Sequence, residues 1–245
     1  MLRKYNLFKE PLATITKYKS LITTINAHCY NISQIDSFYQ DALLNSDILI
    51  PDGISVVWAI KWLAGQKIKK IAGADLFFYE MERLNHTEGK CFFLGSSVET
   101  LNKIKERLKK DYPKVKVQAY SPPFKPDFSD SENEFMVQTI NKFQPDALMI
   151  GMTAPKQEKW AYQHYNDLQV GHICCIGAVF DFYAGTVNRA PKWMIKMGLE
   201  WLYRLIKEPR RMWRRYLAGN ILFIWYVIQE KWNPPASPRA YHMPP

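Results

Sequence analysis

Short apolar runs alternate with amphipathic segments along the first 185 residues. Apolar runs of four to eight residues are typical of buried strands, and apolar positions three or four residues apart are typical of helices. The pattern predicts strands at 20–26, 46–50, 90–97, 114–123, 145–152 and from 171 onward, and helices at 32–45, 55–65, 73–85, 98–110, 129–143 and 156–165. This alternation predicts an α/β fold with a parallel sheet and helices on both of its faces.

The composition changes near residues 185–189. Between Thr186 and Trp232 ten Lys or Arg residues stand against three Glu, so this stretch carries +7 of the net +10 charge. Its segment LEWLYRLIKEPRRMWRR (199–215) alone holds two tryptophans, five arginines and a lysine. We therefore expect a catalytic domain over residues 1–188, a basic and aromatic helical appendage over 189–232, and a flexible proline-rich tail over 233–245.

The charge and the apolar runs restrict the classes of partner. A net charge of +10 and a pI near 9.3 favour nucleic acid, acidic lipid or a phosphorylated substrate. The longest apolar run, Leu217–Ile228, would extend about 18 Å as a helix, short of the roughly 30 Å hydrocarbon core, so we expect no transmembrane span. The N-terminal MLRKYNLFKE lacks the apolar run of a signal peptide. Cys29, Cys91, Cys174 and Cys175 form no C-x-x-C pair, so we expect reduced thiols in the cytosol. The histidines do not have the spacing of metal ligands, so we expect no metal site.

Candidate chemistry lies where glycine-marked strands end, because ligands of open parallel sheets bind at the carboxyl ends of the strands. In ILIPDGIS, Asp52 and Gly53 follow a strand directly. Asp52 is either a general base or ligand anchor, or the cap of the next helix. In FFLGSS, Gly95 opens a helix whose free N–H groups could hold a phosphate, or whose serines could simply cap it.

Two further strand exits carry polar residues. In IGMTAPKQEKW, Gly151 ends the strand, and Lys156 and Gln157 suit a phosphate and an amide or hydroxyl group. The alternative is a polar first helical turn. In IGAVFDFYAGTVNRAPKW, Asp181 lies among aromatic residues and Arg189 precedes a proline. A buried Asp181 needs hydrogen-bond partners, which either a ligand or a turn could supply.

Three other interpretations of the chain remain open at this point. The Trp/Arg segment could bind single-stranded nucleic acid by stacking and phosphate contacts, although it runs directly into the apolar stretch Leu217–Ile228. A nicotinamide-dependent enzyme would need a G-x-G-x-x-G fingerprint and a later acidic residue, and neither is present. Residues 199–228 could also be ordinary core helices.

Taken together, these segments are more specific than any one of them. The pieces TTIN, SDILIPDG, IAGADL, FFLG, GMTAPKQE, GAVFDFYAG, RAPKW and LEWLYRLIKEPRR span about residues 20–215 and resemble the WecG/TagA/CpsF family, glycosyltransferase family 26. The resemblance implies a Rossmann-like fold of the GT-E type. It also implies inverting transfer of a sugar from a UDP-sugar to a polyprenyl-pyrophosphate-linked sugar during cell-surface polysaccharide or teichoic acid-type synthesis. Because the sequence has no D-x-D motif beside a plausible metal pocket, we expect cationic side chains rather than a metal ion to stabilise the leaving UDP. N-acetylmannosamine or its uronic acid is the favoured donor sugar, with glucose and glucuronic acid as alternatives.

The resemblance also implies roles for individual residues. Asp52 matches the proposed general base, and Thr24, Asn26 and Gln157 match residues that line the same pocket. Lys70 stands before IAGAD where many relatives have arginine, which keeps the charge but loses the bidentate fork. We expect these residues to bind substrate together with seven others: Gly53, Asp75, Gly95, Gly151, Lys156, Asp181 and Arg189. Contacts to the acceptor diphosphate and to an anionic membrane are expected from Arg204, Arg210, Arg211, Trp213, Arg214 and Arg215. The implied place is the cytoplasmic face of the bacterial membrane, with peripheral association and no nucleic-acid partner.

Overall fold

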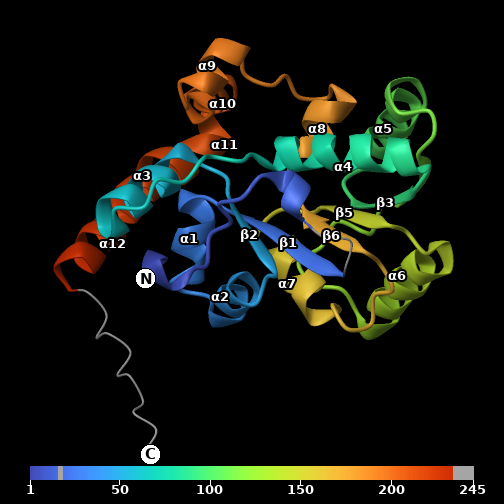
Figure 1. Cartoon of the computed structure of the whole chain (residues 1–245), viewed down its shortest axis with the longest axis horizontal. Coiled ribbons are helices and arrows are strands. Elements are labelled where there is room, and N and C mark those ends of the chain that lie inside the picture. The colour runs from blue at the N-terminus through green and yellow to red at the C-terminus, as the bar shows by residue number, and fades with distance from the viewer. Residues whose placement is uncertain (16–18, 234–245) are drawn as a thin grey trace, which may run out of the picture.

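The fold is built on a sheet of parallel strands, in a computed structural model that describes residues 1–15 and 19–233 (Figure 1). Within these residues the sheet has six strands in the order β2-β1-β6-β5-β3-β4, every neighbouring pair parallel. The strands are β1 (Ser20–Ile25), β2 (Ile48–Pro51), β3 (Lys90–Gly95), β4 (Lys116–Tyr120), β5 (Ala147–Gly151) and β6 (His172–Cys175). The predicted parallel α/β architecture is confirmed.

Helices cover both faces of the sheet (Figure 1). One face packs against α4 (Gly73–Thr87), α5 (Val98–Asp111) and α8 (Val179–Ala184), and the other against α2 (Ser37–Leu44), α6 (Asp130–Phe143) and α7 (Lys156–Gln163). Strand β3 shows why its sequence is apolar throughout. Cys91 and Phe93 face the first helical layer while Phe92 and Leu94 face the second, because successive side chains of a strand point to opposite faces.

The predicted single helix over 32–45 is wrong. The chain instead forms α1 (Ala27–Ser33) and then α2. The Asn26 side chain accepts hydrogen bonds from the backbone N–H groups of His28 and Cys29, so α1 begins as soon as β1 ends. Asp36 accepts one from the Tyr39 N–H and starts α2. Each side chain satisfies helix N–H groups that would otherwise lack an acceptor, and the two caps divide the segment into two helices.

The C-terminal part forms a helical unit above one end of the sheet (Figure 1). Short helices α9 (Lys192–Lys196) and α10 (Glu200–Lys207) lead into α11 (Pro209–Trp213), a π-helical turn (η3, Arg214–Ala218) and α12 (Gly219–Trp232). The last three form one continuous rod over residues 209–232. Its inner face packs on α1 and on α3 (Ile54–Ala64) through Phe223 and Val227. Among the described helices, none is long and apolar enough to cross a membrane.

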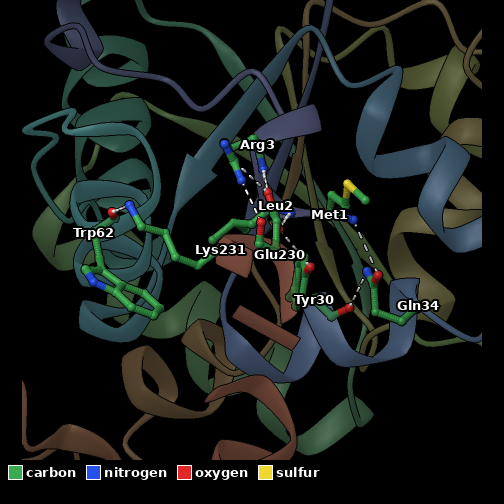
Figure 2. Close-up of polar contacts among 8 residues, drawn as sticks. All are labelled: Met1, Leu2, Arg3, Tyr30, Gln34, Trp62, Glu230 and Lys231. Atoms are coloured by element: carbon green, nitrogen blue, oxygen red, sulfur yellow. Dashed lines mark hydrogen bonds and ion pairs between the residues drawn. The ribbon is translucent and has the colours of Figure 1, made fainter. Parts of the chain in front are cut away.

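The two ends of the described chain meet at Glu230 (Figure 2). The chain begins with 3-10 helices at Leu2–Lys4 and Leu12–Thr14. The buried Glu230 carboxylate of α12 accepts hydrogen bonds from the Leu2 N–H, the Arg3 N–H at 2.9 Å and the Arg3 Nε at 3.2 Å. The Tyr30 hydroxyl of α1 donates a further, longer bond of 3.4 Å to it. A single carboxylate therefore joins the first turn, α1 and the last helix.

Candidate active site

The ends of β1 and β2 bring four of the expected residues together. Thr24 is the register partner of Ile50, and the Asp52 N–H donates to the Ile25 carbonyl at 2.9 Å. Asp52 therefore lies beside Asn26 at the carboxyl edge of the sheet. A Cβ at Gly53 would lie 3.3 Å from the Asn26 Cβ, so glycine permits this close approach. The Asn26 side chain is occupied in capping α1.

The electrostatic setting of Asp52 suits a proton acceptor. Burial raises the pKa of the Asp52 carboxyl to about 6. Lys70 and Arg215 lower this pKa, while the carboxylates of Glu200 and Asp75 raise it further. A carboxyl with a pKa near 6 is largely ionised at pH 7 and yet accepts a proton more readily than an ordinary aspartate.

Lys70 connects the sheet edge to the C-terminal unit. The Ile71 N–H donates to the Pro51 carbonyl at 3.2 Å, which holds this segment against β2. The Lys70 Nζ lies 3.8 Å from one oxygen of Glu200, the first residue of α10, and the Arg189 Nε lies 3.5 Å from the other. Lys70 and Arg189, both expected to bind substrate, thus pair with the same carboxylate, which is also close enough to Asp52 to raise its pKa.

A second acidic residue, which the sequence analysis missed, lies buried at the start of α7. Glu158 accepts a hydrogen bond of 2.8 Å from the Gln157 Nε2, and burial raises the pKa of its carboxyl to about 7. Gln157 is itself buried, close to Gly177, and among the described residues its Oε1 has no hydrogen-bond partner. The only sequence signal was the polar K-Q-E turn, which does not say which of its side chains is buried.

Arg215 connects these groups electrostatically. Its charge lowers the pKa values of Asp52, Glu158 and His28. Burial and Arg215 together lower the pKa of His28 to about 4, so this imidazole is neutral at pH 7. Sequence reasoning also missed His28, because a single histidine three residues after a strand has no motif around it.

The arginines fall into two groups. Within residues 1–15 and 19–233, the Nε atoms of Arg204 and Arg215 are buried and have no hydrogen-bond acceptor, while the buried Arg189 Nε makes only the 3.5 Å ion pair with Glu200. Arg210, Arg211 and Arg214 are exposed, with Arg211 paired to Glu208 at 2.6 Å and Arg214 lying 5.4 Å from the ring of the exposed Trp213. Buried guanidinium nitrogens without acceptors are suited to binding an anion such as a diphosphate.

The sequence comparisons identify the family of the chain. Residues 5–237 match the family described as "Glycosyl transferase WecG/TagA/CpsF family". The chain belongs to this glycosyltransferase family. It is similar to an N-acetylglucosaminyldiphosphoundecaprenol N-acetyl-beta-D-mannosaminyltransferase of Bacillus subtilis (strain 168), at 29% identity over 88% of this chain and 82% of the relative. Proteins of the same description from Bacillus spizizenii (30%, over 74% and 68%) and Staphylococcus aureus strain MW2 (27%, over 94% and 88%) are also similar.

Three other residues that the sequence predicted to bind substrate in this glycosyltransferase, Asp181, Asp75 and Lys156, make different contacts from those of Asp52. Burial raises the pKa of Asp181, while the charges of Arg211 and Arg204 lower it. Asp181 is therefore close enough to these two arginines to interact with them electrostatically. The Asp75 carboxylate accepts the Ala72 N–H at 2.8 Å and caps α4. The Lys156 Nζ donates to the Lys125 carbonyl at 2.5 Å and lies 3.5 Å from the Phe128 ring centroid, so it contacts the segment before α6.

Gly95 and Gly151 are register partners at the ends of β3 and β5. A Cβ on Gly95 would lie 2.8 Å from the Gly151 backbone, and one on Gly151 would lie 2.4 Å from the Phe180 ring. The two glycines therefore permit close packing at this edge. The helix that follows Gly95 is capped by Ser97, whose hydroxyl accepts the Thr100 N–H at 3.1 Å.

The opposite edge of the sheet carries a separate hollow. It has a volume of about 360 Å³ and is lined by Lys19, Arg83, Asp146 and His172, at the amino ends of the strands. In the part of the chain that the structure describes, no three His, Cys, Asp or Glu residues form a group that could hold a metal ion.

Proposed function

We propose that this glycosyltransferase transfers a sugar from a UDP-sugar to a polyprenyl-pyrophosphate-linked sugar, with inversion at the anomeric carbon. The observation that carries the proposal is the setting of Asp52. A half-buried carboxyl with a pKa of about 6 lies at the carboxyl edge of the sheet, where the charges of Lys70 and Arg215 act on it. That arrangement combines a proton acceptor with cations for a leaving diphosphate.

The proposed reaction is one displacement. Asp52 accepts the proton of the acceptor hydroxyl as its oxygen forms a bond to the anomeric carbon, and the bond from that carbon to the UDP oxygen breaks on the opposite face. UDP leaves with an additional negative charge. Lys70, Arg189, Arg204 and Arg215 are the cations placed to stabilise it.

The sugar is proposed from the relatives. Their names specify N-acetyl-beta-D-mannosamine as the transferred sugar and N-acetylglucosaminyl diphosphoundecaprenol as the acceptor. We propose the same pair here, with N-acetylmannosaminuronic acid, glucose and glucuronic acid as the alternative donor sugars. Lys70 in place of arginine offers the donor phosphates a single ammonium instead of a planar fork.

We further propose that residues 189–232 hold the enzyme on the anionic inner face of the bacterial cell membrane. Support comes from the exposed side chains of Trp213 and Leu217 on the rod, next to the exposed Arg210 and Arg214. Tryptophan suits the headgroup level and arginine suits lipid phosphate.

The test is a UDP-release assay on the full chain. Four UDP-sugars are offered with a synthetic short-chain polyprenyl-pyrophosphate-linked N-acetylglucosamine, and the product anomer is read by NMR. We expect acceptor-dependent release with UDP-N-acetylmannosamine and inverted stereochemistry. Retention of configuration, or no acceptor-dependent release with any of the four donors, would overturn the proposal. Binding of the chain to single-stranded DNA but not to anionic vesicles would favour the nucleic-acid interpretation instead.

A further inference from the structure

Helix α3 leaves two tryptophans uncovered in the catalytic domain. Trp58 is 67% exposed and Trp62 48% exposed, and their spacing of four residues places them on one side of the helix. The other side, with Val56, Ile60 and Leu63, is buried in the core. An exposed pair of large aromatic side chains commonly marks an interaction surface.

The last helix of the appendage lies beside α3 (Figure 1). Lys231 of α12 donates a hydrogen bond of 3.0 Å to the Trp62 carbonyl, and its Nζ lies 5.7 Å from the Trp62 ring centroid (Figure 2). The two helices are therefore joined where their apolar side chains come to the surface.

Helix α12 also has an uncovered apolar stripe. Ile221, Trp225 and Trp232 are 71%, 50% and 74% exposed, opposite the buried Phe223 and Val227. At about 100° per residue, the three directions fall within roughly 40° of one another around the helix axis. The stripe is too short to span a bilayer, which is typical of a helix that lies in the plane of the interface.

The exposed charged side chains of α3 and of the segment that follows it are all positive. Between Gly53 and Ala74 the chain has lysines at 61, 67, 69 and 70 and no Asp or Glu, and the first three are exposed. The exposed Arg210 and Arg214 lie on the rod that continues into α12. A second copy would bring the same cations against them, whereas a bilayer with anionic headgroups has the complementary charge. Tryptophan is also enriched at the headgroup level of membranes.

We propose that α3 and the outward stripe of α12 form one membrane-contact surface, so that the catalytic domain itself, and not only the appendage, binds the anionic bilayer. The inference rests on the proposed function, in which the acceptor is a lipid. Helix α3 begins two residues after Asp52, and Trp58 and Trp62 lie about 6 and 12 Å along it from Ile54 at 1.5 Å per residue. Docking through α3 therefore places the candidate base close to the headgroup layer, where the diphosphate of a lipid-linked acceptor lies.

The experiment is co-sedimentation of the full chain with vesicles of phosphatidylcholine containing 30% phosphatidylglycerol. We expect Trp58→Ala/Trp62→Ala to lower the partition coefficient about 10-fold or more, because two interfacial aromatic anchors are lost. We expect Lys61→Gln/Lys67→Gln/Lys69→Gln to lower it about 100-fold at 0.1 M salt, since each basic residue near an anionic surface contributes roughly a fivefold factor. The lysine effect should largely disappear at 0.5 M salt.

Matched controls come from surfaces away from α3. Phe124→Ala removes a fully exposed aromatic ring, and Lys103→Gln/Lys109→Gln/Lys110→Gln removes three exposed lysines from α5. Both should bind vesicles as the unmodified chain does. UDP release with the short-chain, micelle-free acceptor should stay unchanged in every variant, which shows that each one folds.

Two outcomes would overturn the inference. One is unchanged vesicle binding by both the tryptophan and the lysine variants. The other is a shift from dimer to monomer in sedimentation velocity, with vesicle binding intact, which would assign this surface to a second copy. A failure of the proposed function is distinguishable, because the unmodified chain would then bind vesicles and yet release no UDP.

Discussion

The carboxylate of Glu200 lies 3.8 Å from the ammonium of Lys70. Its second oxygen lies 3.5 Å from the Arg189 Nε, so one acidic residue of α10 occupies two cations at the edge of the candidate site. An incoming diphosphate would compete with Glu200 for the same charges. Glu200 also raises the pKa of Asp52, so it links the position of the appendage to the proton affinity of the candidate base.

This link predicts the pH dependence of the reaction. Asp52 must be ionised to accept a proton, so kcat/KM should fall about tenfold per pH unit below about pH 6. Glu200→Gln removes a negative charge that raises the pKa of Asp52. The acidic limb of the profile of kcat/KM against pH should therefore move to lower pH. Initial rates of UDP release between pH 5 and 8.5 measure the shift. Glu208→Gln is the control, because Glu208 pairs with Arg211 and should leave the limb where it is. An unmoved limb in Glu200→Gln would contradict the coupling.

Asp52→Asn should nearly abolish turnover. The amide keeps the shape of the side chain but cannot accept the proton, and general base catalysis contributes roughly 10²–10⁴-fold. We expect kcat to fall within that range while the affinity for UDP, measured by calorimetry, changes by less than about threefold. Turnover close to that of the unmodified enzyme would remove Asp52 from the role of base.

The two groups of arginines should separate in kinetics. Arg215 has a buried Nε without an acceptor among the described residues, and it influences Asp52, so we expect it to bind substrate. Arg215→Gln should lower kcat/KM about 10- to 100-fold, because a hydrogen bond to a charged group contributes about 1.5–3 kcal/mol. Arg210→Gln is the matched change at an exposed position, and it should leave the rate with a short-chain acceptor unchanged. Equal losses of kcat/KM in Arg215→Gln and Arg210→Gln would contradict the division into substrate-binding and exposed arginines.

Glu230 should be important for stability. Glu230→Ala leaves the Leu2 and Arg3 N–H groups and the Arg3 Nε without their acceptor, and a buried donor left without its acceptor costs about 1–3 kcal/mol. Urea unfolding and hydrogen exchange of α12 measure the loss. Glu106→Gln, which removes an exposed ion pair on α5, should leave the unfolding midpoint unchanged. If the unfolding curve of Glu230→Ala overlies that of the unmodified chain, the hydrogen bonds to Glu230 contribute little to stability.

The alternation of apolar runs was sufficient to predict the parallel sheet, because each strand carries its own periodic signal. The split between α1 and α2 was missed, since the apolar positions continue through Ile35 while two side-chain hydrogen bonds, at Asn26 and Asp36, decide where the helices begin. Asp52 and Thr24 come together as expected because the exits of adjacent parallel strands lie at one edge.

Other parts of the site could not be predicted from local patterns. The contact between Lys70 and Glu200 joins residues 130 positions apart, and no periodicity carries that information. The same holds for Glu230, which pairs with residues at the other end of the sequence. Glu158 was missed for a different reason: a polar first turn gives no indication of which of its side chains faces the core.

The junction at Glu230 also sets an order of events during synthesis. The Leu2 amide is made first, but its acceptor lies 228 residues later. At roughly 5–20 residues per second, the ribosome needs about 10–50 s to supply it. During that time Tyr30 has no Phe223 or Tyr226 ring to pack against. The apolar surface of α1 that α12 later covers is therefore exposed on the growing chain. The turn at Leu2–Lys4 therefore reaches its final place only after α12 has been made.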